Sequence, residues 1–143
     1  MRTPSSINGL WGVRVADTAS RRILVVDDAS LVRMYYRNAL ERAGYEVDEA
    51  LNGLEALEKL LVRAPDLLIV DVNMPKMDGF TFLRALRRQE GDVAATPAMI
   101  TSTEAKTEDF EAAQSAGANF YLVKPIPQET LIDYVAMLCG PAR

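Results

Sequence analysis

Four short runs of mainly apolar residues recur along the chain, at 23–26, 67–70, 98–101 and 120–123. Brief continuous runs of this kind are typical of strands that are buried on both faces of a parallel sheet. A fifth segment, 45–49, alternates apolar and polar residues, which indicates a half-exposed strand at a sheet edge. The pattern therefore predicts strands that alternate with helical segments.

The segments between the strands space their apolar residues as helices do. The first predicted helix begins near Ser30, its N-cap, and continues to about Ala43, where Gly44 supplies a stop. Asn52 turns into the second helix, and the fourth is expected to stop at Gly117. The apolar positions are Leu54, Leu57, Leu60 and Leu61 in the second helix, Phe80, Leu83 and Leu86 in the third, Phe110 and Ala113 in the fourth, and Leu131, Val135 and Leu138 in the last.

Five strand–helix units of this kind form one α/β domain, with right-handed crossovers and helices on both faces of the sheet. We place this domain at residues 21–143. Residues 1–20 contain serine, asparagine and glycine at positions that break any regular pattern, and we expect a flexible extension there. An arm docked on the domain stays open as an alternative, because this segment also contains Leu10, Trp11, Val13 and Val15.

Each of the four runs leads into a reactive polar side chain. Asp27 and Asp28 follow the first run, Asp71 the second, Ser102 the third and Lys124 the last. Ligands bind such sheets outside the carboxyl ends of the strands, so these side chains are expected to meet at one edge. A single aspartate after a strand is usually a turn residue or a helix cap; the repetition in four runs indicates a site.

Three carboxylates at one edge repel one another by several kcal/mol per pair, for separations of about 4 Å and an effective dielectric of about 20. A divalent cation would relieve this repulsion. Mg²⁺ fits best, because it combines one or two carboxylates and several waters with a phosphate oxygen. Lys124 can neutralise phosphate oxygens as a point charge. The pattern thus predicts a magnesium site that accepts phosphate.

The composition narrows the chemistry further. The chain has no histidine, which excludes Ser-His-Asp and Cys-His catalysis, histidine-ligated zinc and phosphohistidine transfer from this chain. Cys139 is the only cysteine, so no internal disulfide can form, and a reducing compartment is expected.

The charge and hydropathy favour a cytoplasmic protein without nucleic-acid or membrane partners. A formal net charge of −4 speaks against a nucleic-acid binder, and the cluster of Arg84, Arg87 and Arg88 is expected to be a solvated helix face. No stretch approaches the roughly 20 apolar residues of a membrane span. The first twenty residues lack the apolar core of a secretory leader.

Four stretches carry a family resemblance. They are Leu24-Val25-Val26-Asp27-Asp28, Asp71-Val72-Asn73-Met74-Pro75-Lys76-Met77-Asp78-Gly79, Ser102-Thr103-Glu104-Ala105-Lys106 and Tyr121-Leu122-Val123-Lys124-Pro125. In order and spacing, residues 22–139 resemble the receiver domain of two-component response regulators, close to the single-domain CheY type. The resemblance implies a flavodoxin-like (βα)5 fold with strand order 2-1-3-4-5, the site at its topological switch point, and a cis peptide bond before Pro125.

The resemblance also implies a role for each site residue. Asp71 would accept a phosphoryl group from a histidine kinase or a histidine phosphotransfer protein, since a carboxylate can attack phosphorus and form an acyl phosphate. Asp28, Asp71 and the backbone carbonyl of Asn73 would bind Mg²⁺ directly, and Asp27 mainly through water. Lys124 would pair with phosphate oxygens.

Signal readout is implied for two further residues. The hydroxyl of Ser102 would move to the new phosphate, and Tyr121 would turn inward behind it. Thr101 is the rival hydroxyl, although counting back from Lys124 favours Ser102. Phosphorylation adds roughly −1.5 to −2 charge, enough to bias a loop and reshape a partner surface on the fourth helix, last strand and last helix.

Two features depart from the best-known motility members of the family: Val72 stands where they carry tryptophan, and the N-terminal extension is additional. Asn73 and Glu104 match that group and suggest a short-lived phosphoryl state. No output domain follows Arg143 in this sequence, so output is expected through protein contacts, with chemotaxis and other phosphorelays both open.

Three functions are compatible with these residues. The favoured one is a stand-alone phospho-switch, which is not an enzyme beyond its own phosphoryl uptake and autodephosphorylation. The alternatives are a degenerate receiver that serves only as a binding module, and a haloacid-dehalogenase-type phosphatase. The phosphatase normally places Asp-x-Asp after its first strand, whereas here the nucleophile candidate Asp71 lies later.

Overall fold

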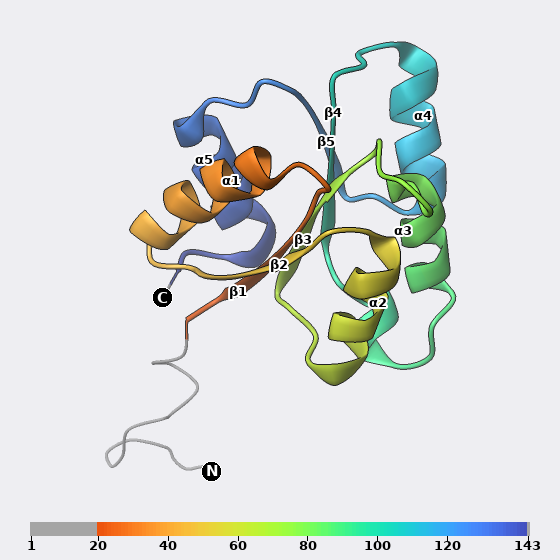
Figure 1. Cartoon of the computed structure of the whole chain (residues 1–143), viewed down its shortest axis with the longest axis horizontal. Helices are drawn as coiled ribbons and strands as arrows, with labels where there is room; N and C mark the ends of the chain where they lie inside the picture. The colour runs from red at the N-terminus through yellow and green to blue at the C-terminus, as the bar shows by residue number, and fades with distance from the viewer. Residues whose placement is uncertain (1–19, 143) are drawn as a thin grey trace.

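The computed structural model describes residues 20–142 and contains five strands that alternate with five α-helices (Figure 1). The strands are β1 (Arg22–Val26), β2 (Glu46–Ala50), β3 (Leu67–Asp71), β4 (Ala98–Ser102) and β5 (Phe120–Val123). The helices are α1 (Ser30–Arg42), α2 (Gly53–Val62), α3 (Gly79–Arg87), α4 (Thr107–Ala116) and α5 (Gln128–Cys139), with a short 3-10 helix, η2 (Asp92–Ala95), between α3 and β4. The predicted alternation is confirmed. The expectation for the extension falls on residues 1–19, which lie outside the described part.

The strands form one parallel sheet in the order β2-β1-β3-β4-β5, as the resemblance implied. Helices α1 and α5 pack side by side on one face, and α2, α3 and α4 cover the other (Figure 1). The sheet thereby separates two apolar cores, one centred on Leu24, Val70 and Phe82, the other on Ile23, Ile69 and Leu131. This doubly wound arrangement brings the carboxyl ends of all five strands to one edge.

The burial of the strands follows their place in the sheet. β1, β3 and β4 are buried along their whole length, as the continuous apolar runs predicted. β2 is only partly buried, as expected of an edge strand: Glu46 is exposed, Val47 and Ala50 are buried, and the two residues between them are half-buried. The fourth run differs, because β5 is only partly buried and Val123 remains 38% exposed. β5 is the other edge of the sheet, so one side of it has no neighbouring strand among the described residues.

The helices begin and end within a residue or two of the expected positions. Ser30 is the first helical residue of α1 rather than its N-cap, which is Ala29 and makes no side-chain cap hydrogen bond. Asn52 caps α2 by accepting a hydrogen bond from the Glu55 amide. Gly117 ends α4 in the left-handed conformation, at φ 98°, where glycine is favoured.

The core-facing stripe of α2 was predicted partly wrongly. Ala56 and Leu60 are buried, whereas Leu54 and Leu61 are 50% and 67% exposed. Positions 56 and 60 are four residues apart and face the sheet together, which turns Leu54 and Leu61 outward. In α3, Leu83 and Leu86 are buried as expected, and Phe82 is fully buried as well although the pattern did not single it out. Phe110 of α4 is 42% exposed.

Candidate functional site

Residues at the carboxyl ends of four strands build the site. Asp27 follows β1, Asp71 is the last residue of β3, Ser102 is the last residue of β4 and Lys124 follows β5. One carboxylate oxygen from each of Asp27, Asp28 and Asp71 lies within 4.8 Å of the others. The predicted cluster of three carboxylates and an ammonium is therefore present in the structure.

Lys124 links the two buried carboxylates of the cluster. Its Nζ donates hydrogen bonds to Asp71 Oδ1 at 2.8 Å and to Asp27 Oδ2 at 3.2 Å. The side chains of Asp27 and Asp71 are 2% and 8% exposed, and that of Lys124 is 19% exposed. Asp28 lies at the exposed side of the cluster. Three carboxylates face one ammonium, which leaves an excess of negative charge at this edge.

The pKa values reflect this excess. Burial raises the pKa of the Asp71 carboxyl, the hydrogen bond from Lys124 partly counteracts it, and the charges of Asp27 and Asp28 raise it further. Burial alone would lower the pKa of the Lys124 ammonium, but the hydrogen bond to Asp71 and the charges of Asp27 and Asp71 outweigh burial and raise it. Lys124 thus stays charged, and a further cation would stabilise the ionised form of Asp71.

A hard divalent cation fits this donor set. All three side chains offer carboxylate oxygens, the ligands that Mg²⁺ and Ca²⁺ prefer. One ammonium balances only one of the three charges, so a cation would remove the remaining repulsion. Asn73, whose backbone carbonyl was expected as a ligand, lies exposed two residues after Asp71.

The loop after β3 holds Asp71 from behind. The Gly79 amide donates to the Val72 carbonyl at 2.9 Å, and a Cβ at position 79 would collide with the backbone carbonyl of Asp71. Asp78 then caps α3 by accepting from the Thr81 amide at 2.8 Å. A glycine is therefore required where the loop turns back over the end of β3. The Lys124–Pro125 peptide bond on the other side of the site is cis, as expected.

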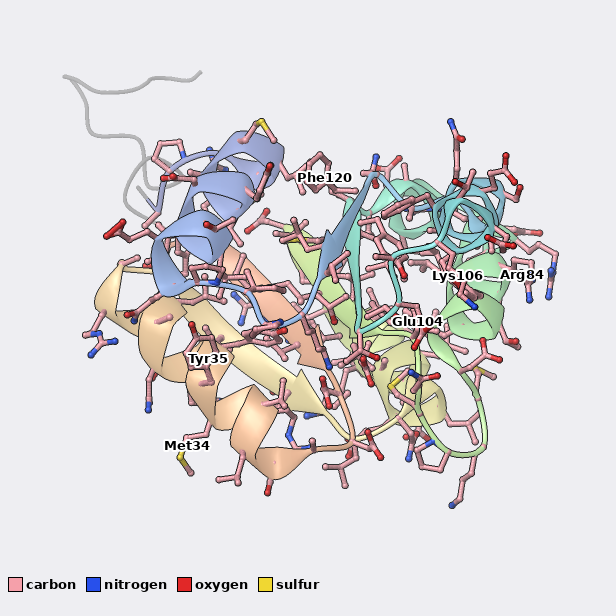
Figure 2. All side chains as sticks on the ribbon, turned by 90° about the horizontal axis from the view of Figure 1, so that it is seen from above. Met34, Tyr35, Arg84, Glu104, Lys106 and Phe120 are labelled. Carbon is pink, nitrogen blue, oxygen red and sulfur yellow. The ribbon has the colours of Figure 1, made fainter. Side chains whose placement is uncertain are left out.

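Glu104 lies in the loop between β4 and α4 (Figure 2), and its backbone connects the two expected switch residues. Ser102 Oγ accepts a hydrogen bond from the Glu104 amide at 3.1 Å, and the Tyr121 hydroxyl donates to the Glu104 carbonyl at 2.8 Å. The ring of Tyr121 packs edge-on against Phe110 with centroids 4.7 Å apart. A shift of the Ser102 hydroxyl would therefore disturb the segment that also holds Tyr121.

Thr101 has a different environment from Ser102. Both are fully buried, but neighbouring residues of a strand point to opposite faces of the sheet. Among the described residues, Thr101 Oγ1 has no hydrogen-bond partner. Tyr36 of α1 is also buried. Burial raises the pKa of its hydroxyl, and the charge of Lys124 and the nearby Thr101 side chain act in the opposite direction.

Two arginines have roles that the sequence analysis did not assign. Arg33 of α1 donates to the backbone carbonyl of Asp27 at 2.7 Å. Arg87 donates to the carbonyls of Gly117, Ala94 and Thr96, at 3.0 Å or less, so the expectation of a solvated arginine face is wrong for this residue. Arg84 and Arg88 are exposed as expected. An arginine that binds backbone carbonyls leaves no pattern in the sequence, because any residue supplies its acceptor.

Comparison with known proteins agrees with this architecture. The chain is 38% identical over 120 residues to the transcriptional regulatory protein PrrA of Mycobacterium leprae and 39% identical over 119 residues to PrrA of Mycobacterium tuberculosis. These matches cover 84% and 83% of this chain, and 50% of each relative, so the chain spans about half the length of these curated relatives. Chemotaxis protein CheY4 of Vibrio cholerae superposes with a TM-score of 0.79 at 38% identity, over 84% of this chain and 99% of CheY4.

No helix within residues 20–142 is long and apolar enough to cross a membrane.

Residues 23–136 match the family model of the response regulator receiver domain. This match covers most of the chain and includes Asp27, Asp28, Asp71, Ser102 and Lys124. The chain therefore belongs to the response regulator receiver domain family.

Proposed function

We propose that this chain is a phospho-switch that accepts a phosphoryl group on Asp71 from a histidine kinase or a histidine phosphotransfer protein. The observation that carries the proposal is the buried Asp71 carboxylate, hydrogen bonded to Lys124 at 2.8 Å and within 4.8 Å of the carboxylates of Asp27 and Asp28. A nucleophile, a phosphate-neutralising cation and an oxygen-rich metal site are thereby combined at one sheet edge. The haloacid-dehalogenase alternative is set aside, because the family match is to receiver domains.

The transfer forms one bond and breaks another. An Asp71 carboxylate oxygen attacks phosphorus, and the bond from phosphorus to the donor's imidazole nitrogen breaks, which gives an acyl phosphate and a free imidazole. Asp28, Asp71 and the carbonyl of Asn73 would hold Mg²⁺, with Asp27 acting mainly through water; the ion supplies neutralisation of phosphate oxygens. Lys124 adds a second positive charge for the same oxygens. Asn73 and Glu104, which flank the site, would tune the lifetime of the phosphoryl group.

Output is proposed to pass through the β4–α4 loop. A phosphate on Asp71 would draw the Ser102 hydroxyl away from the Glu104 amide, and Tyr121, which is bonded to the same residue, would follow. The surface formed by α4, β5 and α5 would then change and recruit a target protein. Residues 21–143 would form this receiver unit with residues 1–20 as an extension, in the cytoplasm, without nucleic-acid or membrane contact by the receiver itself.

Phosphoryl uptake from a small acyl-phosphate donor tests the proposal. The purified chain should take up phosphate with Mg²⁺ present, chelation should stop uptake, and Asp71→Asn should abolish it. Asp78→Asn is the matched control, because it makes the same chemical change at the exposed cap of α3, a position that asparagine also caps well. Uptake by Asp71→Asn equal to that of the parent would move the nucleophile elsewhere, and no uptake by the parent would favour the binding-module alternative.

A further inference from the structure

Arg33 joins the acidic loop of the site to the edge strand of the sheet. Its Nη1 donates to the Asp27 carbonyl at 2.7 Å and its Nε donates to Glu49 Oε1 at 2.7 Å. The side chain is 11% exposed, so both bonds are largely shielded from water. A single guanidinium thus spans from the residue that follows β1 to a carboxylate on β2.

The acidic loop is also held through Asp27, whose Oδ2 accepts a hydrogen bond from Lys124 Nζ at 3.2 Å. Asp27 leaves the sheet after its amide donates to the Ala50 carbonyl at 3.1 Å, and its Oδ1 accepts from the Ala29 amide at 2.9 Å. Ala29, the N-cap of α1, cannot accept a hydrogen bond with its side chain. Because Asp27 and Asp28 must both face the site, the orientation of this short turn decides where their carboxylates lie.

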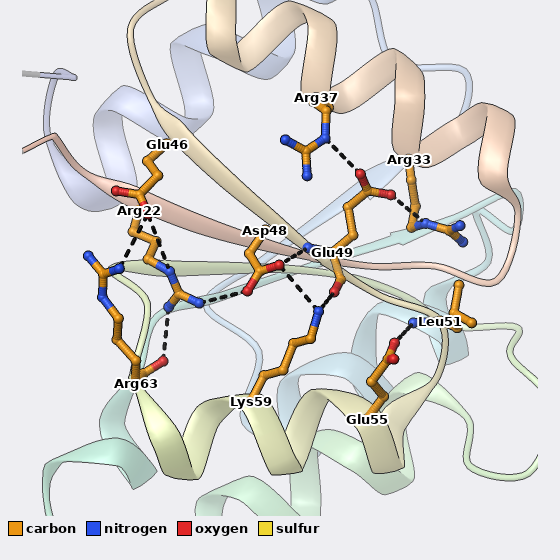
Figure 3. Close-up of polar contacts among 10 residues, drawn as sticks. All are labelled: Arg22, Arg33, Arg37, Glu46, Asp48, Glu49, Leu51, Glu55, Lys59 and Arg63. Carbon is orange, nitrogen blue, oxygen red and sulfur yellow. Dashed lines mark hydrogen bonds and ion pairs between the residues drawn. The ribbon is translucent and has the colours of Figure 1, made fainter.

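Glu49 is a firm anchor for Arg33 (Figure 3). Its second oxygen accepts from Arg37 Nε at 2.7 Å, and Arg37 is itself held by Glu41 at 2.7 Å. Lys59 of α2 donates to the backbone carbonyl of Glu49. The carboxylate is therefore fixed by two arginines spaced four residues apart on one face of α1.

We propose that Arg33 is a positioning residue that holds the Asp27–Asp28 turn in its metal-binding orientation, with Glu49 as its anchor. The inference rests on the proposed function, because it assigns the turn to Mg²⁺ binding. The positioning role and simple electrostatics predict opposite changes in Mg²⁺ affinity when Arg33 is removed. Removal of a positive charge beside a cation site should strengthen Mg²⁺ binding, whereas loss of a positioning group should weaken it.

The matched control is Arg37. It lies on the same helix face, carries the same charge and donates to the same Glu49 carboxylate at the same 2.7 Å. Within residues 20–142 its second partner is Glu41, and it makes no hydrogen bond to Asp27. Arg33→Ala and Arg37→Ala therefore remove equal charge and one Glu49 ion pair each. They differ in the other partner of each guanidinium, which is the Asp27 carbonyl for Arg33 and the more exposed Glu41 for Arg37.

Titration calorimetry of Mg²⁺ on the folded variants tests the assignment. Arg33→Ala should bind Mg²⁺ about 10- to 100-fold more weakly than the parent, the usual loss when a group that orients a metal ligand is removed. Arg37→Ala should bind as tightly as the parent or more tightly. Arg33→Lys should recover only part of the affinity, because a single ammonium lacks the planar fork of donors that spans both acceptors.

Amide exchange in metal-free protein supplies a readout that does not depend on the ion. The amides of residues 27–29 should exchange faster in Arg33→Ala and at the parent rate in Arg37→Ala. Parent-like affinity and exchange in Arg33→Ala, or an equal loss in both alanine variants, would each overturn the positioning role while leaving the proposed function intact. A parent that binds no Mg²⁺ would overturn the proposed function and this inference with it.

Discussion

At the scale of single residues, Asp71 combines two opposing influences. Burial and the neighbouring carboxylates of Asp27 and Asp28 disfavour its charged form, while the hydrogen bond from Lys124 favours it. A nucleophilic carboxylate must be ionised, so the Lys124 contact and a bound cation both serve the same end. Without a bound metal ion, the ionised Asp71 carboxylate therefore lowers the free energy of unfolding.

The pH dependence of stability follows from this penalty. The pKa of Asp71 is raised in the folded state, so its favourable contribution to the free energy of unfolding is present below the unfolded pKa and is lost as pH rises through the folded pKa. Without Mg²⁺, Asp71→Asn should therefore be more stable than the parent near about pH 7, and the difference should shrink toward about pH 4. Urea unfolding at both pH values measures it, with Asp78→Asn as control. A variant less stable than the parent near neutral pH would show that the Lys124 ion pair outweighs burial.

Most of the candidate site residues could be predicted, because their side chains are themselves the charged groups that the chemistry requires. Asp27, Asp28, Asp71 and Lys124 each follow a buried run, and the sheet brings them together. Arg33 could not be predicted in the same way, because its acceptor at Asp27 is a backbone carbonyl whose direction depends on the turn.

At the scale of elements, the β4–α4 loop is the proposed link between phosphorylation of Asp71 and output. Ser102 and Tyr121 come from different strands and meet at the two backbone groups of Glu104. This arrangement gives the loop a hydrogen-bonded state that a phosphate on Asp71 would compete with. The response of the loop to phosphorylation should therefore depend strongly on the Ser102 hydroxyl, whereas phosphoryl uptake should depend on it only weakly.

Ser102→Ala separates the two steps. The variant should still accept phosphate, because nucleophile and ammonium remain, but its response should drop. A hydrogen bond to a charged phosphate is worth about 1.5–3 kcal/mol, or roughly a ten- to hundredfold shift in a two-state population. Amide exchange over residues 103–123, with and without beryllofluoride, measures the response. A full response in Ser102→Ala together with a lost response in Thr101→Ala would make Thr101 the switch hydroxyl.

Arg87 fixes the opposite end of the same elements. Its guanidinium binds the carbonyls of Ala94, Thr96 and Gly117, and so connects α3 to η2, to the C-cap of η2 and to the C-cap of α4. Arg87→Ala should lower the free energy of unfolding by more than about 2 kcal/mol, because several partly buried carbonyls lose their donor. Arg84→Ala, on the exposed side of α3 (Figure 2), should stay within about 0.5 kcal/mol of the parent. Chemical denaturation measures the free energy of unfolding of both variants. Equal losses would show that Arg87 behaves as a solvated surface arginine after all.

The elements themselves were predictable where local pattern and tertiary position agree. The runs in β1, β3 and β4 are continuous because both faces of these strands are covered. The run in β5 looks the same in the sequence, but its exposure depends on the strand order, which no local pattern contains. The α2 stripe failed for a related reason: leucines surround that helix, and the sheet decides which side is buried.

At the scale of the whole molecule, the doubly wound sheet places the site and the proposed output surface around one edge. The two cores on either side of the sheet hold β1, β3 and β4 in register. The polar residues at the ends of these strands are thereby held side by side. The curated relatives are about twice the length of the matched region, so further segments can accompany a receiver of this kind. The central claim concerns only the receiver: phosphate enters at this edge, on Asp71.

Chemical trapping tests that claim most directly. The chain is incubated with an acyl-phosphate donor and Mg²⁺, reduced with borohydride, which converts an aspartyl phosphate to homoserine, and then digested for mass spectrometry. The account predicts homoserine at position 71, its absence when Mg²⁺ is chelated, and unmodified aspartate at positions 27 and 28. Homoserine at either of those positions, or phosphate found on a hydroxyl such as that of Ser102 with Asp71 intact, would contradict it.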